Sequence, residues 1–202
     1  MGRKKLIIMK MYFTRLTPNF NNWKQPSGRD GKCKSSNPKK PLYEETNGFG
    51  WEEWLFEQYH IHKHESEFEC NGFIEAFNKQ NQKIDKVKRL YLYTKLCNNT
   101  KGIMPGNYYV GYIDNVSPIK NIAKTNEEVH NTLTNVGIMH DGYIPMLPFA
   151  LNISFKVKDV HVDFEGVFKR PIRLERGQFR FSLYDMNKHT NFIVAISKYT
   201  NQ

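Results

Sequence analysis

The sequence predicts an α+β fold in which a mixed β-barrel is flanked by helices. Apolar and polar residues alternate over most of the middle and end of the chain, and this period of two is typical of half-buried strands. Segments with helical spacing are fewer and short. The chain has 202 residues, 39% of them hydrophobic and 14% aromatic, which is enough for one core. We therefore expect residues 1–202 to form a single domain.

The first expected strand covers residues 4–16, which are rich in β-branched and aromatic residues. A long loop follows, because Pro, Gly, Ser and Asn punctuate residues 17–41 throughout. A loop of this length is unusual in a compact domain unless it has a function or is mobile.

Gly48 and Gly50 allow a sharp turn before a short expected helix. One face of that helix would carry these residues: Trp51, Trp54, Leu55 and Gln58. We expect Trp54 to pack inward and Trp51 to lie at the rim of a pocket. The adjacent acids, Glu52 and Glu53, would occupy the first turn, where the helix dipole favours carboxylates.

Two strands with regular alternation are expected next, at residues 89–96 and 107–116, with a bulge or a close approach at Gly111. A helix should then begin at the capping box of Thr125 and Glu128 and end at Gly137. Further alternating segments predict a strand at 67–77, a strand pair or one long bent strand at 151–164, and a strand at 177–186. Residues 190–199 fit either a strand or a helix.

Positive charge is concentrated at the start of the chain. The net charge is +10; residues 1–40 hold eleven Lys and Arg and one acid, Asp30, while the rest balances. Such a block suits a polyanion, since neutralised phosphates release counterions. The alternative is a solubilising arm, but this segment contains four aromatic residues, which such arms lack: Tyr12, Phe13, Phe20 and Trp23.

The three cysteines, Cys33, Cys70 and Cys97, are too few and too scattered to predict a disulfide framework or a zinc ribbon. We expect reduced thiols in a cytoplasmic protein. No run of 18 apolar residues exists, and Lys10 and Arg15 interrupt the apolar start, so neither a membrane partner nor a signal peptide is expected.

Catalytic and metal sites are not expected. His60, His62 and His64 would share one face of a strand, but three ligands from one strand are awkward for a metal, and a solvated segment is the preferred interpretation. The one acid–x–Lys triplet begins at Asp30 and lacks an upstream acid, which metal-dependent nucleases need. A phosphate-binding glycine loop is also missing. We expect no cofactor and no catalytic residue.

Trp23 differs from a typical core residue because it lies in a polar, basic loop beside Asn22, Lys24 and Ser27. An aromatic ring among amides and cations is the composition that stacks a nucleobase and contacts its phosphate. We therefore expect Trp23 in a base-binding pocket.

The strand order resembles the YTH and EVE domains of the PUA-like superfamily. The resemblance covers residues 6–24 and 88–184 and includes the kernel Tyr109-Val110-Gly111-Tyr112 and the later strand with Phe155, Val157 and Val160. The segment 45–87, which holds "NGFGWEEWLF", is an insertion relative to a minimal YTH domain, so the family's pocket carries over by position to Trp23. That insertion motif also looks similar to proteins encoded near restriction systems.

The resemblance implies a PUA-like reader of double-stranded DNA, which flips a modified, methylated base out of the duplex and into an aromatic pocket of the protein. It further implies a modification-dependent restriction system, with a nuclease or NTPase partner. The expected pocket residues are aromatic or polar: Asn22, Trp23, Ser27, Trp51, Trp54, Tyr91, Tyr93, Tyr109 and Asp114. The expected backbone contacts are cations of the basic loop 24–41 and of the later strands: Lys24, Arg29, Lys32, Lys34, Lys39, Lys40, Arg170 and Arg173.

Two other functions stay open at this point. One is a metal-dependent nuclease that uses His60, His62, His64 and nearby acids. The other is a YTH-like reader of RNA, which the sequence does not distinguish from a reader of DNA.

Overall fold

The computed structural model describes residues 10–80, 84, 86–123, 126–135, 150–174 and 183–186. The expected segment 190–199, most of the expected strand 177–186 and the capping residue Thr125 lie outside these ranges. No helix in the described ranges is long and apolar enough to cross a membrane.

The described strands form one mixed sheet in the order β2-β5-β4-β3-β1-β8, and β6 and β7 both pair with β4. Their bounds are as follows: β1 Lys10–Leu16, β2 Glu69–Gly72, β3 Val87–Leu96, β4 Gly106–Ala123, β5 Ala150–Lys156, β6 Val160–Val162, β7 Arg173–Leu174 and β8 Tyr184–Asp185. The expected strands 89–96 and 107–116 are thus confirmed within β3 and β4. Of the two alternatives for residues 151–164, the strand pair is confirmed, and a short 3₁₀-helix, η2 (Val157–Asp159), separates the two strands.

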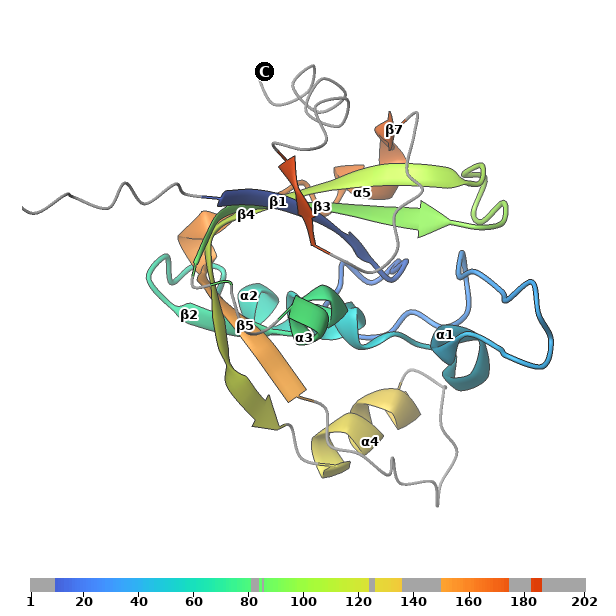
Figure 1. Ribbon diagram of the computed structural model, residues 1–202, viewed down its shortest axis with the longest axis horizontal. Helices are drawn as coiled ribbons and strands as arrows, with labels where there is room; N and C mark the ends of the chain where they lie inside the picture. Colours follow the sequence, from blue (N-terminus) through green and yellow to red (C-terminus); the bar gives the residue numbers. More distant parts are fainter. Residues whose placement is uncertain are drawn as a thin grey trace, which may run out of the picture.

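The long strand β4 joins the two halves of this sheet (Figure 1). Its first half pairs with β3, β6 and β7, and its second half pairs with β5. The pairing with β5 is irregular between Pro118 and Ile122, where proline lacks the N–H that a ladder needs. The strand bends strongly, and the two halves of the sheet enclose much of the core (Figure 1).

Strand β1 lies parallel to β3, with Tyr12 opposite Leu90 and Thr14 opposite Leu92. A parallel pair needs a long crossover, and here residues 17–86 supply it. They include β2, which pairs antiparallel with β5. The segment 45–87, expected as an insertion, therefore contributes an edge strand to the same sheet.

The helices are short: α1 Tyr43–Asn47, η1 Trp51–Trp54, α2 Glu57–His62, α3 Glu75–Gln80, α4 Asn126–Asn135 and α5 Gly166–Lys169. The helix expected near residue 126 is confirmed. The single helix expected after Gly50 is wrong, because a 3₁₀ turn and α2 replace it. The chain turns between them at Phe56, whose N–H donates to the carbonyl of Trp23 at 2.8 Å.

The α+β class is therefore confirmed, whereas the closed barrel is not formed by the described strands. Their path runs from β2 at one edge to β8 at the other, so the sheet is strongly bent but open. Assignment to the PUA-like superfamily stays a prediction.

Candidate functional site

A β-bulge at Gly111 builds an aromatic surface on β3 and β4. Gly111 lies opposite Leu92, and Tyr109 lies opposite Tyr93, so Val110 is the extra residue. The bulge changes the alternation, and Tyr109 and Tyr112 consequently face the same side of the sheet although they are three residues apart.

The expected close approach at Gly111 is confirmed. Its φ is 147°, and a Cβ there would lie 2.4 Å from the carbonyl oxygen of His161 on β6. A side chain at this position would therefore push β6 away from β4. The glycine lets His161 pair opposite Tyr112.

Tyr112 is the middle layer of a three-part stack. The guanidinium carbon of Arg89 lies 3.9 Å from the centroid of the Tyr112 ring, a cation–π distance. The imidazole of His161 stacks on Tyr112 with ring centroids 4.4 Å apart and planes 22° apart. We call these three residues the Arg89–Tyr112–His161 stack.

Asp114 binds one end of the stack and lies near the other. Arg89 Nε and Nη2 donate to its two carboxylate oxygens at 2.7 and 2.9 Å, a bidentate geometry that fixes the guanidinium plane. The hydrogen bond to Asp114 raises the pKa of Arg89, which stays charged. His161 Nε2 lies 3.7 Å from Asp114 Oδ2. The Asp114 carboxylate therefore orients the Arg89 guanidinium over the Tyr112 ring.

A pocket of about 530 Å³ opens beside this stack. Its walls come from β4, β6, α5 and the approach to β7: Tyr109, Val110, Gly111, Tyr112, His161, Asp163, Gly166, Val167, Arg170 and Ile172. The volume lies within the range of about 300–1,000 Å³ that small-molecule sites occupy. Aromatic, aliphatic and cationic groups therefore meet in one hollow.

Tyr109 lines this pocket and has a buried hydroxyl. Among the described residues that hydroxyl has no hydrogen-bond partner, which is uncommon for a buried polar group. Burial raises the pKa of Tyr109, so the phenol keeps its proton and can donate to a ligand atom.

The structure brings together only part of the expected pocket. Tyr91, Tyr109 and Asp114 lie on the face that carries the stack; the Tyr91 and Tyr112 ring centroids are 5.8 Å apart. Tyr93 is fully buried with Phe13 on β1, so its expected place at the pocket is wrong.

Trp23 is a core residue and not a pocket residue. Only 1% of it is exposed, its indole N–H donates to the carbonyl of Thr17 at 2.9 Å, and its ring stacks near Phe168 of α5. A loop without regular structure needs its own anchor, and Trp23 supplies it. The backbone carbonyl oxygen of the neighbouring Asn22 lies 3.0 Å from His60 Nε2.

Trp54 is likewise buried, whereas Trp51 is partly exposed. The expected inward and outward orientations are thus confirmed. Both rings belong to a cluster with Phe49, and Trp23 belongs to a different cluster. The expectation that Trp51 shares one pocket with Trp23 and the strand tyrosines is therefore wrong, because the tyrosines belong to a third cluster.

Glu53 is the centre of a buried network and does more than complement a helix dipole. Its two carboxylate oxygens accept from five donors: Asn19 Nδ2 at 2.8 Å, the Ser27 N–H at 2.9 Å, Ser27 Oγ at 3.4 Å, the Gly50 N–H at 2.8 Å and Lys32 Nζ at 2.9 Å. Burial raises the pKa of Glu53, and the Lys32 ammonium opposes this shift. Ser27, expected in the base pocket, is thus part of this network.

Lys32 was expected to contact phosphate, and the structure corrects this. It is 5% exposed and pairs with Glu53, so its charge is neutralised internally. The other expected cations are exposed: Lys24, Arg29, Lys34, Lys39, Lys40, Arg170 and Arg173. Two of these also have partners, since Arg170 pairs with Asp163 at 3.0 Å and Arg173 donates to the Pro105 carbonyl at 3.1 Å.

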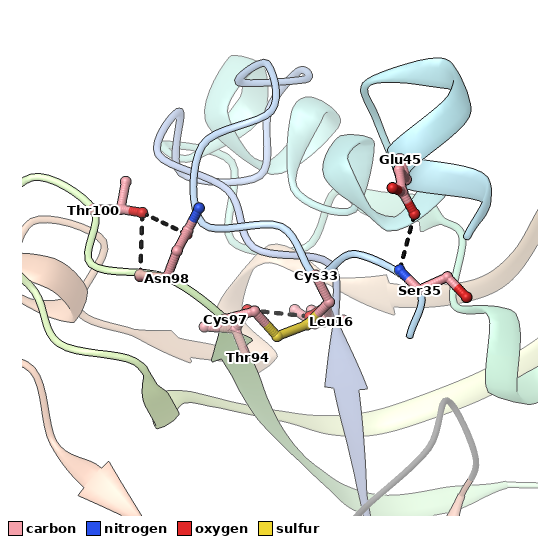
Figure 2. Close-up of a disulfide and its surroundings, with 8 residues drawn as sticks. All are labelled: Leu16, Cys33, Ser35, Glu45, Thr94, Cys97, Asn98 and Thr100. Atoms are coloured by element: carbon pink, nitrogen blue, oxygen red, sulfur yellow. Dashed lines mark hydrogen bonds between the residues drawn. A yellow bond between two sulfur atoms is a disulfide. The ribbon is translucent and has the colours of Figure 1, made fainter. Parts of the chain in front are cut away.

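A disulfide joins Cys33 to Cys97, 64 residues apart (Figure 2). The expectation of reduced thiols is therefore wrong for this pair. The expected cytoplasmic location was based on reduced thiols, and it loses that support. The N–H of Cys97 also donates to the Gly31 carbonyl at 3.0 Å. The basic loop is thus tied to the end of β3, next to the Leu16–Thr94 contact between β1 and β3 (Figure 2). Cys70 is free and buried.

The three alternating histidines do not form the single face of a strand. His60 and His62 lie on α2, where His60 approaches Asn22 and His62 bonds to Glu65 and stacks on Phe68. No group of three metal-ligating side chains occurs within the described ranges.

Sequence reasoning missed Arg89, Tyr112 and His161 as site residues. Tyr112 carried a usable signal, because a bulge at Gly111 places it on the face of Tyr109. The register that pairs Arg89 with Asp114 and brings His161 onto Tyr112 depends on tertiary structure.

No family model, no curated protein and no solved structure matches this chain.

Proposed function

We propose that this chain binds nucleic acid and takes one unpaired or flipped base into the pocket beside the Arg89–Tyr112–His161 stack. The observation that carries the proposal is the position of His161. One face of its imidazole packs on Tyr112, yet 42% of the side chain is exposed, and it lines the pocket. A planar base that enters extends the stack, and base–aromatic stacking is worth roughly 1–3 kcal/mol.

Two further groups support a nucleotide as the ligand. Arg170 lies at the pocket, and its ion pair with Asp163 is 81% and 63% exposed, so the pair contributes little and can exchange for a phosphate. The Tyr109 hydroxyl offers a hydrogen bond to a base edge. The exposed lysines of the loop 24–41 add contacts that do not depend on sequence.

We extend the proposal to a methylated base in duplex DNA. A methyl group against an apolar wall contributes only about 0.8 kcal/mol, so discrimination must come mainly from hydrogen bonds such as that of Tyr109. In this proposal the chain is the recognition module of a modification-dependent restriction system, and a nuclease or NTPase partner does the cutting.

A binding screen tests this function. Fluorescently labelled duplexes that each carry one methylated base, together with single-stranded RNA, would be titrated with the wild type, with His161→Ala and with Tyr109→Phe. We expect His161→Ala to weaken binding at least fivefold and Tyr109→Phe to reduce the preference between bases. His64→Ala, at an exposed histidine outside the pocket, is the matched control.

Arg170→Ala would be titrated in the same screen, and wild-type affinity in both His161→Ala and Arg170→Ala would overturn the proposed pocket. The nuclease alternative is tested separately with Mg²⁺, Mn²⁺ and Zn²⁺, and cleavage by this chain alone would contradict a purely reading role. A preference for RNA in the screen would favour the RNA reader.

A further inference from the structure

A second aromatic surface lies at α1, away from the Arg89–Tyr112–His161 stack. Tyr43 is 44% exposed and the preceding Leu42 is 37% exposed. The Tyr43 ring lies 5.9 Å from that of Trp51, and Trp51 stacks on the buried Trp54 at 5.8 Å. An exposed ring is thus backed by a rigid aromatic layer that reaches the core.

The short helix α1 contains no buried residue. Its Tyr43 ring makes an edge-to-face contact with the buried Phe49, with ring centroids 5.7 Å apart, and polar contacts add to this packing. Glu45 Oε2 accepts from the Ser35 N–H at 2.9 Å (Figure 2), and the Gly48 N–H caps the end of the helix by donating to the Glu44 carbonyl at 2.9 Å. These bonds present Tyr43 without hiding it.

The loop that leads into α1 carries three exposed lysines: Lys34, Lys39 and Lys40. The disulfide at Cys33 fixes one end of this lysine segment, and the Ser35–Glu45 bond fixes it to α1 (Figure 2). After Ser35, Asn37 organises a turn, since its Oδ1 accepts from the Lys39 N–H at 3.0 Å. The lysines are therefore presented by a tethered segment and not by a free arm.

We propose that Tyr43 and the lysines at 34, 39 and 40 form a second site, which binds single-stranded nucleic acid. Tyr43 stacks a base, Trp51 supports it from behind, and the lysines contact the adjacent phosphates. This combination of an exposed aromatic ring with cations is how sequence-tolerant single-strand sites are built. A paired base cannot present its face to Tyr43, which is why the ligand is a single strand. The inference rests on the proposed nucleic-acid function and adds a contact surface to it.

The test uses the full chain and a fluorescein-labelled oligothymidine of about 20 nucleotides, longer than the roughly 4–16 nucleotides that one such site covers. Fluorescence anisotropy would compare the wild type with Tyr43→Ser and with the double variant Lys39→Ala/Lys40→Ala. We expect Tyr43→Ser to weaken binding at least fivefold, and the lysine variant to reduce both the affinity and its dependence on salt. Ile61→Ser is the control, because Ile61 is 68% exposed and lies on α2.

Thermal melts would confirm that Tyr43→Ser folds like the wild type. Wild-type affinity in both variants would overturn the inference, even if the pocket variant His161→Ala loses binding. Weakening by Tyr43→Ser without an effect of His161→Ala would support this second site and count against the pocket. Equal binding of an acidic peptide, insensitive to Tyr43→Ser, would show a surface that recognises charge alone and would also overturn it.

Discussion

The ammonium of Lys32 lies 2.9 Å from a carboxylate oxygen of Glu53, and the two side chains are 3% and 0% exposed. This buried ion pair ties the basic loop to the 3₁₀ turn that carries Trp54. Removing one partner of such a pair leaves a charge without compensation in the interior, at a cost of about 3–5 kcal/mol. The loop is therefore part of the core structure at Lys32 and a surface only beyond it.

We expect Lys32→Met to lower the free energy of unfolding by about 3 kcal/mol, because Glu53 keeps its donors from Asn19, Ser27 and Gly50 but loses its counter-charge. Urea denaturation measures this directly. The control is Lys34→Met, two residues away and exposed, which should change stability by less than about 0.5 kcal/mol. Equal effects of the two substitutions would show that the buried pair does not hold the loop.

The neighbouring Glu52 should make stability depend on pH in the opposite sense to an ordinary paired carboxylate. It accepts from Thr17 Oγ1 at 2.8 Å and from the Glu75 N–H at 3.2 Å, but burial raises its pKa to about 7. In the unfolded chain it ionises near the ordinary value of 4.5. Between pH 4.5 and about 7 the unfolded state therefore binds fewer protons than the folded state. The free energy of unfolding consequently falls as the pH rises through this range.

Glu52→Gln should remove this slope, because glutamine imitates the protonated carboxyl. Relative to the wild type, the variant should gain up to about 3 kcal/mol by pH 8, because each tenfold change in an ionisation constant is worth about 1.4 kcal/mol. Urea titrations at several pH values measure it, with the exposed Glu69→Gln as the control. If the stability of Glu52→Gln depended on pH as steeply as that of the wild type, this would contradict the raised pKa of Glu52.

The three tryptophans should separate into two classes. Trp23 and Trp54 are each 1% exposed, so Trp23→Ala and Trp54→Ala should each cost about 3–5 kcal/mol of stability. Trp51→Ala should cost clearly less, since its ring is partly exposed. Thermal or urea unfolding ranks the three variants. A small loss in Trp23→Ala would return that residue to the list of binding candidates.

Local patterns predicted much of the fold, and long-range contacts decided the rest. The alternation in residues 89–96 and the glycine at 111 were enough to place β3 and the bulge in β4. The parallel pairing of β1 with β3 and the pairing of Cys33 with Cys97 join residues more than 60 positions apart, and no local pattern encodes them. Trp23 was misassigned because its polar neighbours in sequence are not its neighbours in space.

The bulge also gives the sharpest test of how the site is built. Gly111→Ala should cost about 1–3 kcal/mol from overpacking, because its Cβ would lie 2.4 Å from the His161 carbonyl oxygen, and further strain comes from its φ of 147°. Gly102→Ala is the matched control: its φ is 80°, but a Cβ there meets no atom within 4 Å. Urea unfolding should therefore rank Gly111→Ala as the more destabilised.

Because the contact is with β6, Gly111→Ala should also displace His161 and weaken base binding, whereas Gly102→Ala should bind normally. Equal loss of stability in the two variants would mean that β6 moves away at little cost, and that the pocket beside Tyr112 is not rigidly formed.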